Sequence, residues 1–476
     1  MVTTTTAETH YDVVVVGGGP GGYATALYAS AAGLSVALVE RDKVGGTCLH
    51  RGCIPAKEFL ETASVFRSVS RARDYGVNSS VQEVDFSVSQ ARKNTVVEQL
   101  FKGLSGLLVG RKVTVIGGIA TLYPGKLVKV TRGADAGVEI VGRNIVLAPG
   151  SIPRTLPGLD VDGRIVLTSD EFLDMNSVPE SAAVVGGGAI GCEFASLLCD
   201  LGTNVTILEA LPALLSGCDR DVTAVVTRSF KKRGMEIATS VEVRGHQPIE
   251  GGRGTVVHFG DGESREVDKI VVSVGRRPRT EGLLASDTGV TVDERGFVIT
   301  DAYQQTHAEG VWAVGDVVAG TPQLDHVGFA EAIVAVKGIL GEPVLPVDYE
   351  KIPWAIYCHP EVAFAGLTED AATERGYDIV TMKDPFGGNS RARIIGETEG
   401  MVKVVAERAP DGSTGRILGV HMVGPWVTEQ LGAGYLALNW EATPADVAQF
   451  IQPHPTLSET FGETMLALTG RGLHIG

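Results

Sequence analysis

Cysteine is scarce in this sequence, with six residues among 476. So few cysteines cannot form the framework of a disulfide-rich secreted domain. Long apolar runs are also absent, because glycine, proline or charge interrupts every Val, Ile and Leu cluster before the roughly 18 residues of a membrane span. Basic residues are outnumbered: 41 Lys and Arg against 57 Asp and Glu leave a net charge of -16. This charge disfavours a nucleic-acid or anionic membrane surface, so small molecules and proteins are the expected partners.

The chain is long enough for about three domains at roughly 150 residues each. Its 44% hydrophobic and 21% charged residues are typical of a globular protein. The first ten residues, MVTTTTAETH, lack the basic start and apolar run of a secretory signal. We therefore expect a cytoplasmic protein, in which a close pair of cysteines indicates catalysis or metal binding.

The segment YDVVVVGGGPGGYATALYASAAGLSVALVE reads as a strand, a glycine turn, an alanine-rich helix and a second strand. Gly17, Gly19 and Gly22 have the GxGxxG spacing, which lets the backbone approach a pyrophosphate at a helix N-terminus. Glu40 ends the second strand and is expected to bind an adenosine ribose. Alone the spacing is weak evidence, because a glycine turn can simply connect a strand to a helix.

The same pattern recurs in AAVVGGGAIGCEFASLLCDLGTNVTILE. Its members are Gly186, Gly188, Gly191 and Glu209. Gly186 lies 169 residues after Gly17, and Glu209 lies 169 residues after Glu40 (186 − 17 and 209 − 40). Two such units imply two dinucleotides, most simply a flavin and a nicotinamide. A carboxylate at Glu209 accepts from a ribose 2′-OH but repels a 2′-phosphate, which favours NAD over NADP.

Two cysteines lie five residues apart in GGTCLHRGCIPAK, which spans residues 45–57. Five residues of regular helix rise about 7.5 Å, whereas a disulfide rarely joins Cα atoms more than about 7 Å apart. If Cys48 and Cys53 form a bridge, the segment is distorted, and Gly52 supplies the backbone freedom. A strained, accessible bridge is easily reduced. Zinc binding is an alternative, although structural zinc sites usually have four ligands; two unlinked buried thiols are another.

With these motifs the chain resembles the pyridine nucleotide-disulfide oxidoreductases over essentially its whole length, and within them the enzymes that oxidise dihydrolipoyl groups. The resemblance implies that the cysteine pair is a redox-active disulfide in which Cys48 exchanges with substrate and Cys53 faces the flavin. Lys57 follows Cys53 by four residues, so a helix places both on one face. By resemblance Lys57 lies beside the flavin and pairs with Glu193; a solvated helix lysine is the alternative.

The resemblance extends to three further segments. THAEGVWAVGD ends on Asp316, which by resemblance binds the ribityl chain of FAD, although it could also cap the next helix. LDHVGFAEA matches the place of an alanine–histidine pair near the flavin pyrimidine, with His326 conforming and Asp325 replacing the alanine. Gly150 ends LAPG at a crossing strand of the FAD side, and Gly275 in VSVGRRPRTEGL marks the exit from the nicotinamide unit.

A base near Cys48 is needed, because thiol–disulfide exchange proceeds through thiolates. In QPHPTLSETFGE two prolines flank His454, and the segment resembles the HPTxxE signature of the family. The resemblance implies that His454 is the acid–base residue, that Glu459 orients its ring, and that His454 acts in the other subunit of a homodimer. Two alternatives stay open: a capping box from Thr456 to Glu459, and a packed core histidine.

The expected fold class is α/β, with two Rossmann-like dinucleotide-binding domains for FAD and NAD and a C-terminal α+β dimerisation domain. We expect an FAD domain at 1–155, an NAD domain at 156–281, a central segment at 282–350 that completes the FAD domain, and an interface domain at 351–476. By resemblance the protein oxidises dihydrolipoyl groups and passes hydride to NAD⁺. Its expected partners are lipoyl domains and core subunits of 2-oxo acid dehydrogenase or glycine cleavage complexes, with no nucleic acid, membrane or metal.

Two rival functions remain. A glutathione-reductase-like enzyme would run from NADPH to a disulfide, but Glu209 and Ala189, where those reductases commonly carry a tyrosine, count against it. A docking subunit or redox-insensitive flavin protein belongs to a different class, and it would be indicated if the substrate failed to reduce the bound flavin.

Overall fold

The structure is a computed structural model that describes residues 9–80, 83–249, 251 and 254–475. Residues 1–8, which make up most of the segment used for the expectation of no secretory signal, lie outside the described residues. The chain forms two compact units: Met1–Glu58, Ser87–Arg154 and Gly275–Tyr349 make the first, and Phe59–Phe86, Thr155–Val274 and Glu350–Gly476 make the second. Among the described helices, none is both long enough and apolar enough to cross a membrane.

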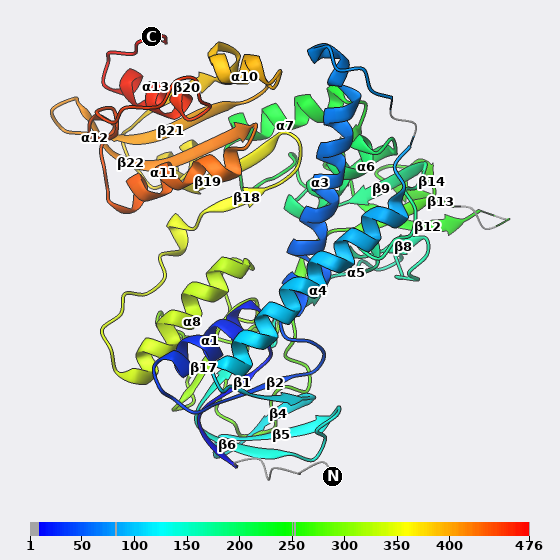
Figure 1. Cartoon of the computed structure of the whole chain (residues 1–476), viewed down its shortest axis with the longest axis vertical. Helices are drawn as coiled ribbons and strands as arrows, with labels where there is room; N and C mark the ends of the chain where they lie inside the picture. The colour runs from blue at the N-terminus through cyan, green and yellow to red at the C-terminus, as the bar shows by residue number, and fades with distance from the viewer. Residues whose placement is uncertain (1–8, 81–82, 250, 252–253, 476) are drawn as a thin grey trace. The chain divides into compact units, whose positions relative to one another are not determined.

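The first unit is built on a sheet in which the described strands follow the order β3-β2-β1-β6-β5-β4, with β17 paired to β6 (Figure 1). Its strands are β1 (His10–Val16), β2 (Val36–Glu40), β3 (Thr114–Gly117), β4 (Ile119–Tyr123), β5 (Leu127–Arg132), β6 (Glu139–Leu147) and β17 (Val311–Ala313). β1 pairs in parallel with β2 and β6, and its valines are buried on both faces, as parallel strands require.

Helices cover one face of this sheet. α1 (Pro20–Ala31) and α8 (Asp325–Leu340) lie side by side there, joined in one apolar core by the end of α4 (Phe86–Gly110) (Figure 1). On the opposite face, β4 and β5 pack over β1 and β6. Beside the sheet, β7 (Ser151–Pro153) pairs with β16 (Arg276–Pro278). The cysteine segment forms α2 (Gly46–Arg51) and the start of α3 (Cys53–Ser70).

The second unit contains a sheet of described strands in the order β11-β10-β9-β15-β8. These strands are β8 (Val166–Leu167), β9 (Ser181–Val185), β10 (Asn204–Glu209), β11 (Glu236–Thr239) and β15 (Lys269–Val272). α6 (Ala189–Asp200) follows β9 and packs on β9 and β10. Other elements of this part are α5 (Ser169–Phe172), α7 (Arg220–Lys232), β12 (Val243–Pro248), β13 (Thr255–Phe259) and β14 (Glu263–Val267).

The C-terminal part of the second unit is an antiparallel sheet with described strands in the order β18-β19-β22-β21-β20. Its strands are β18 (Trp354–Ile356), β19 (Glu361–Gly366), β20 (Ile379–Pro385), β21 (Met401–Arg408) and β22 (Thr414–Gly424). α11 (Val427–Asn439) and α13 (Glu459–Leu468) close its core. Shorter helices are η1 (Ala72–Tyr75), η2 (Tyr349–Lys351), α9 (Glu369–Glu374), η3 (Phe386–Gly388), α10 (Ser390–Ile394) and α12 (Pro444–Val447).

A buried lysine ties two segments of the second unit together. Lys403 of β21 is 0% exposed, and its ammonium bonds Asp219 at 2.9 Å, Asp221 at 2.7 Å and Glu369 at 2.7 Å. Burial raises the pKa of both aspartates, but the Lys403 ammonium and other hydrogen bonds outweigh it and leave each pKa below its usual value. The three carboxylates offset the free-energy cost of burying the Lys403 charge, whereas an unpaired ammonium or an unpaired carboxylate would be costly to bury.

The two glycine units have the same local structure. Gly17 and Gly186 have φ values of 106° and 105°, and α1 and α6 both follow an N-cap glycine, Gly19 and Gly188. The predicted α/β architecture, with a repeated strand–helix–strand unit and a C-terminal α+β part, is confirmed. The four-part domain division stays a prediction.

Candidate active site

The two cysteines of GGTCLHRGCIPAK lie on either side of a break in the helix. α2 ends at Arg51, Gly52 has φ −144° and ψ −113°, and α3 begins at Cys53. This is the kind of distortion that a disulfide between residues five apart would require. Both side chains are half-buried and are unlinked thiols in the structure. Their Sγ atoms and a carboxylate oxygen of Asp325 all lie within 4.8 Å of one another.

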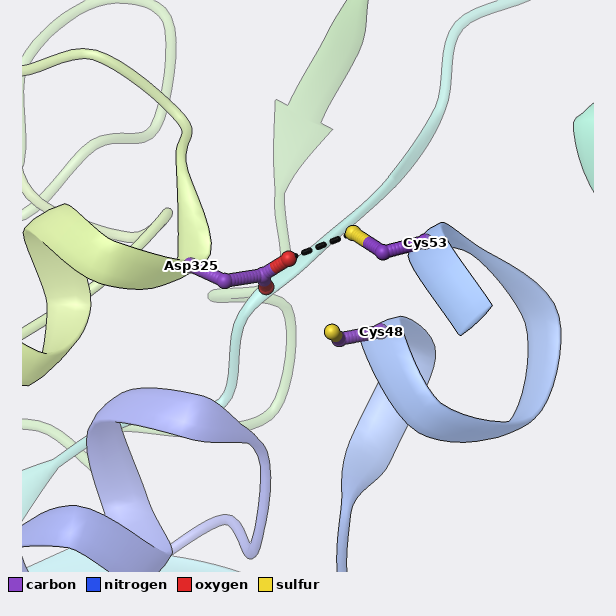
Figure 2. A group of neighbouring side chains, drawn as sticks. All are labelled: Cys48, Cys53 and Asp325. Carbon is purple, nitrogen blue, oxygen red and sulfur yellow. Dashed lines mark hydrogen bonds between the residues drawn. The ribbon is translucent and has the colours of Figure 1, made fainter. Parts of the chain in front are cut away.

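Asp325, the departure from the family pattern, reaches the cysteine pair. The Cys53 thiol donates to Asp325 Oδ2 at 2.5 Å, and Figure 2 shows Cys48 beside Cys53, with Asp325 pointing toward both sulfurs. The pKa of the Cys48 thiol is raised by its hydrogen bond with Cys53, by burial, and by the nearby charges of Cys53 and Asp325. Two sulfurs and one oxygen could also hold a thiophilic ion, although three donors are one short of a structural zinc site.

A cavity of about 890 Å³ extends from Cys48 along the glycine loop of the first unit. Six of the predicted cofactor-binding or catalytic residues line it: Gly17, Gly19, Glu40, Cys48, Gly150 and Asp316. Asp325 lies on its wall as well. A cavity of this size is at the upper end of ordinary ligand pockets, as a large dinucleotide requires. The structure therefore brings the first glycine motif and Cys48 to one site.

The glycines of the first loop cannot be replaced without collisions. A Cβ on Gly17 would lie 2.1 Å from the Ala148 carbonyl oxygen, and one on Gly22 would lie 1.8 Å from the Gly17 oxygen. A Cβ on Gly46 would lie 2.6 Å from the Gly19 Cα, so the cysteine segment packs directly against the glycine loop. This tight backbone at the N-terminus of α1 is the cradle that a pyrophosphate needs, and the residues fit FAD.

Glu40 binds the loop that it follows in sequence. Its carboxylate accepts from the Gly18 amide at 2.6 Å and from the Asp42 amide at 2.8 Å. Each carboxylate oxygen can accept a further bond, so ribose hydroxyls can still bind there. Glu209 repeats this arrangement in the second unit, where it accepts from the Gly187 amide at 2.5 Å and from the Leu211 amide at 2.7 Å.

The second glycine loop is equally tight. A Cβ on Gly186 would lie 2.4 Å from the Ser273 carbonyl oxygen, and one on Gly191 would lie 1.9 Å from the Gly186 oxygen. Gly188 is the N-cap of α6. These contacts fit a second dinucleotide at the N-terminus of α6. Gly275 has φ 95° in the first unit, where its carbonyl accepts from the Arg154 amide at 2.9 Å.

Asp316 follows β17 and is held by two residues that the sequence did not indicate. Ser151 donates its hydroxyl to Asp316 Oδ2 at 2.5 Å, and Arg276 Nε lies 3.8 Å from the same oxygen. Burial raises the pKa of Asp316, and the Ser151 bond and the Arg276 charge oppose this shift. Asp316 does not cap α8, whose N-cap is Leu324 with no side-chain cap. The cap alternative is therefore wrong for this helix.

The structure also gives the positions of three further predicted residues, Lys57, Glu193 and His326. Lys57 and Cys53 both lie in the first turns of α3, four residues apart, as the helix prediction requires. Glu193 is 4% exposed and accepts from the Tyr357 amide at 2.9 Å. The pairing of Lys57 with Glu193 stays a prediction, since the two belong to different units. His326 is exposed in the first turn of α8.

His454 and Glu459 meet in the C-terminal part of the second unit. His454 Nδ1 lies 2.8 Å from Glu459 Oε1, while Glu459 Oε2 accepts from the Thr456 amide at 2.7 Å. The Thr456 hydroxyl donates to Pro453, so only one half of the expected capping box is present. Burial raises the pKa of Glu459, but the Thr456 amide and His454 outweigh burial and lower the pKa. The His454 ring is exposed, so the packed-core alternative is wrong.

Residues 50 and 51, between the two cysteines, contact their own segment. His50 Nε2 lies 2.9 Å from the Val44 carbonyl oxygen, and the ring packs edge-on against Phe101. Arg51 pairs with Asp42. These contacts hold the loop that carries Cys48.

Comparison with known proteins places this geometry in a family. Residues 11–335 match the model described as pyridine nucleotide-disulphide oxidoreductase, and residues 352–465 match the dimerisation domain of that description. The dihydrolipoyl dehydrogenase of Bacillus subtilis is 39% identical, with 98% of this chain and 99% of the relative covered. That of Rhizobium etli is 38% identical, with the same coverage of 98% and 99%.

Solved structures agree. LpdA from Mycobacterium tuberculosis superimposes with a TM-score of 0.89 at 26% identity, covering 97% of this chain and 99% of that one. The HOCl-induced flavoprotein disulfide reductase from Escherichia coli gives a TM-score of 0.84 at 27% identity, covering 96% and 99%.

Proposed function

Since the chain belongs to the pyridine nucleotide-disulphide oxidoreductase family, we propose that it acts as a dihydrolipoyl dehydrogenase. Cys48 and Cys53 would take two electrons from a dihydrolipoyl dithiol, and FAD held beside them would supply the acceptor from which NAD⁺ receives hydride. The observation that carries this proposal is the cysteine pair, split by Gly52, of which Cys48 lies at the wall of a cavity that includes the first glycine loop.

The FAD-binding residues are those of the first unit. The backbone of Gly17, Gly19 and Gly22 receives the pyrophosphate at the N-terminus of α1, Glu40 receives the adenosine ribose, and Asp316 binds the ribityl chain. When bound, FAD supplies an acceptor of two electrons that can pass hydride to a nicotinamide. Gly150, Lys57 and His326 complete this side of the site.

The chemistry of the chain itself is thiol exchange. A substrate thiolate attacks Cys48 Sγ, the bond to Cys53 breaks, and Cys53 leaves with the electron pair. The second substrate thiol then displaces Cys48, which releases the lipoyl disulfide. His454 takes the substrate proton, and Glu459 holds its ring with Nδ1 toward the carboxylate and Nε2 free for the proton.

Glu209 determines the choice of nicotinamide. Its carboxylate lies at the end of β10 and is fixed by two backbone amides, so a 2′-phosphate would meet a fixed negative charge. The enzyme therefore uses NAD⁺, which binds at Gly186, Gly188 and Gly191 with Glu193 and Gly275 nearby on the nicotinamide side.

The active form is a homodimer in which His454 serves the partner's cysteine pair. Two observations support this: residues 352–465 match a dimerisation-domain model, and large apolar side chains before His454 are exposed in the single chain, among them Phe450 at 69% and Ile451 at 96%. Residues 1–155 and 282–350 form the FAD domain, 156–281 the NAD domain, and 351–476 the interface domain.

The enzyme serves lipoyl domains and core subunits of 2-oxo acid dehydrogenase or glycine cleavage complexes. All of these carry the same dithiol, so the site chemistry alone does not choose among them. A cytoplasmic location agrees with the low cysteine content.

The test is the initial rate of NADH formation from dihydrolipoamide and NAD⁺ by the purified flavin-loaded protein. Cys48→Ser should abolish turnover, whereas Cys199→Ser, which changes another half-buried thiol, should leave it unchanged. NADP⁺ should support far slower turnover. A protein whose flavin is reduced by NADPH but not by dihydrolipoamide would indicate a reductase of another disulfide, and retained turnover in Cys48→Ser would refute the thiol relay.

A further inference from the structure

A loop of the second unit packs against the second glycine motif. Residues 210–218 lie between β10 and α7, and Leu215 within this loop is buried. The Leu215 amide donates to the Gly187 carbonyl oxygen at 2.8 Å, and the Cys192 thiol donates to the same oxygen at 3.3 Å. The Gly187 amide donates to Glu209. Contacts from the protein therefore fix both the amide and the carbonyl of Gly187.

Leu215 adopts a backbone conformation that leucine seldom takes. Its φ is 49°, in the left-handed region where the Cβ of an L-residue crowds the backbone. A residue in this conformation persists only when its surroundings hold it, and such residues cluster at functional sites. In this conformation the Leu215 amide meets the Gly187 carbonyl oxygen, so the strain accompanies a hydrogen bond to the glycine motif.

The first unit makes the same hydrogen bond with a glycine. Gly45 has φ 105° and donates its amide to the Gly18 carbonyl oxygen at 2.8 Å. The Gly18 amide donates to Glu40. Gly45 follows Glu40 by five residues (45 − 40), and in the second unit Leu215 follows Glu209 by six (215 − 209). Both units therefore bind the residue after the first motif glycine from a left-handed position that follows the acid.

The bond to Leu215 decides where the next amide points. In a planar trans peptide, the carbonyl of one residue and the amide of the next point in opposite directions. Because the Gly187 carbonyl is held toward Leu215, the Gly188 amide faces away from the loop, at the N-cap of α6. Backbone amides at a helix N-terminus are the donors that a pyrophosphate meets.

Hydrogen bonds at both ends keep this loop in place. Near its start, the Leu211 amide donates to Glu209 at 2.7 Å, and the Leu211 carbonyl accepts from the Ser240 amide at 3.0 Å. Directly after the loop, Asp219 caps α7 and binds the buried ammonium of Lys403. The position of the loop is therefore set by contacts of the protein itself.

We propose that Leu215 is a positioning residue for NAD⁺. Its main-chain amide holds the Gly187 carbonyl toward the loop, so that the Gly188 amide is turned to the pyrophosphate before NAD⁺ arrives. Fixing a donor in advance removes the cost of ordering it on binding. This inference deepens the proposed function and rests on the assignment of the second glycine motif to NAD⁺.

The test is the Kd of NAD⁺ for the oxidised, flavin-loaded protein, measured by calorimetry without an electron donor. Leu215→Gly and Leu215→Ala both remove the packed side chain, but only glycine adopts φ 49° freely. NAD⁺ should therefore bind the alanine variant roughly 5- to 30-fold more weakly than the glycine variant, as the cost of a left-handed L-residue implies. Equal Kd values in the two variants would mean that Leu215 acts through its side chain, and would overturn the proposal.

A third variant removes the donor itself. Leu215→Pro has no amide proton and holds φ near about −65°. Its Kd for NAD⁺ should rise about tenfold, from the loss of the hydrogen bond to Gly187. A wild-type Kd in this variant would be incompatible with the proposal.

Lys112 supplies a matched control in the first unit. It also has a positive φ, 58°, and its amide donates to the Val109 carbonyl oxygen at 2.9 Å. Lys112→Gly and Lys112→Ala should both keep the wild-type Kd for NAD⁺. The same ratio between alanine and glycine variants at Lys112 as at Leu215 would refute a specific role for Leu215.

FAD content and the midpoint of thermal unfolding establish that each variant is folded. FAD content should stay at the wild-type level, because the first unit keeps its own bond between Gly45 and Gly18. If Leu215→Pro does not fold, the ratio between the alanine and glycine variants decides. A wild type that binds NAD⁺ but is not reduced by dihydrolipoamide would end the proposed function, and the role of Leu215 would stand on that ratio. A wild type that binds no NAD⁺ would refute both.

Discussion

Replacing Glu459 with glutamine tests the assignment of the base most closely. Glu459 Oε2 accepts from the Thr456 amide, and Oε1 lies 2.8 Å from His454 Nδ1. In Glu459→Gln the amide oxygen can still accept from Thr456, but an NH₂ group then faces His454. Since that group donates, Nδ1 must accept, and the neutral ring carries its proton on Nε2. A ring in this tautomer cannot take a proton from the substrate at Nε2.

The expected loss of kcat in Glu459→Gln follows from the lost hydrogen bond between Glu459 and His454. During turnover His454 becomes positively charged, and a hydrogen bond to a charged group contributes about 1.5–3 kcal/mol. This corresponds to a loss of roughly 10- to 150-fold in kcat. Removing the base itself, in His454→Gln, sets the upper limit, since general base catalysis contributes roughly 10²- to 10⁴-fold. The KM for dihydrolipoamide should change little.

The same helix supplies a matched control. Glu463 contacts His474 as Glu459 contacts His454: its Oε1 lies 3.1 Å from His474 Nδ1, and its Oε2 accepts a backbone amide. The assay is NADH formation from dihydrolipoamide and NAD⁺ across pH 6 to 9. Glu463→Gln should keep wild-type kcat. The reasoning is refuted if Glu459→Gln stays within twofold of the wild type, or if both variants lose the same activity.

Three further predictions concern the cofactors and the fold. Gly17→Ala should abolish FAD retention, measured by the visible absorbance of the purified protein. Gly33→Ala should retain FAD, because Gly33 is also at positive φ but has nothing within 4 Å of an added Cβ. Equal FAD retention in the two variants would contradict the assignment of the first glycine loop as the pyrophosphate site. Glu209→Ala should raise the KM for NAD⁺ by roughly tenfold or more, from the loss of charged hydrogen bonds to ribose, and should narrow the preference over NADP⁺; an unchanged ratio of kcat/KM values would contradict this role. Lys403→Met should lower the free energy of unfolding in guanidinium by about 3–5 kcal/mol, because it leaves buried carboxylates unpaired. Lys403 lowers the pKa of Asp219 in the folded protein, so the stabilisation is present above the pKa of Asp219 in the unfolded chain and is lost as the pH falls through its pKa in the folded protein. The difference in unfolding free energy between wild type and variant should therefore shrink below about pH 4. A difference that does not depend on pH would exclude the ion pairs as its cause.

The parts of the fold that were predictable depend on local spacing. Gly17 and Gly186 are needed because the backbone turns at positive φ against a carbonyl oxygen, and the sequence shows this need as two glycine motifs of equal spacing. A break at Gly52 was predictable for a chain in which Cys48 and Cys53 form a disulfide, because five helical residues are too long for that bond. The partners of Asp316 were not predictable, since Ser151 and Arg276 reach it from β7 and β16, which pair only in the folded chain.

Long-range contacts limited the site prediction in the same way. The sequence identified Asp325 as a departure and placed its charge near the flavin, but the 272 residues between it and Cys53 hide the hydrogen bond. The Lys403 cluster was missed because its carboxylates come from α7 and α9, far from β21 in sequence. For Glu459 the catalytic and capping alternatives both had support, and the structure uses one carboxylate oxygen for each.

The central claim is that Cys48 and Cys53 accept two electrons from a dihydrolipoyl dithiol and pass them to NAD⁺. Counting alkylatable thiols by mass spectrometry, before and after anaerobic addition of one equivalent of dihydrolipoamide, tests it most directly. The account predicts that Cys48 and Cys53 become alkylatable only after reduction, that the other four cysteines are unaffected, and that NAD⁺ reverses the change with formation of one NADH. Six alkylatable thiols before reduction, or no change on adding dihydrolipoamide, would contradict it.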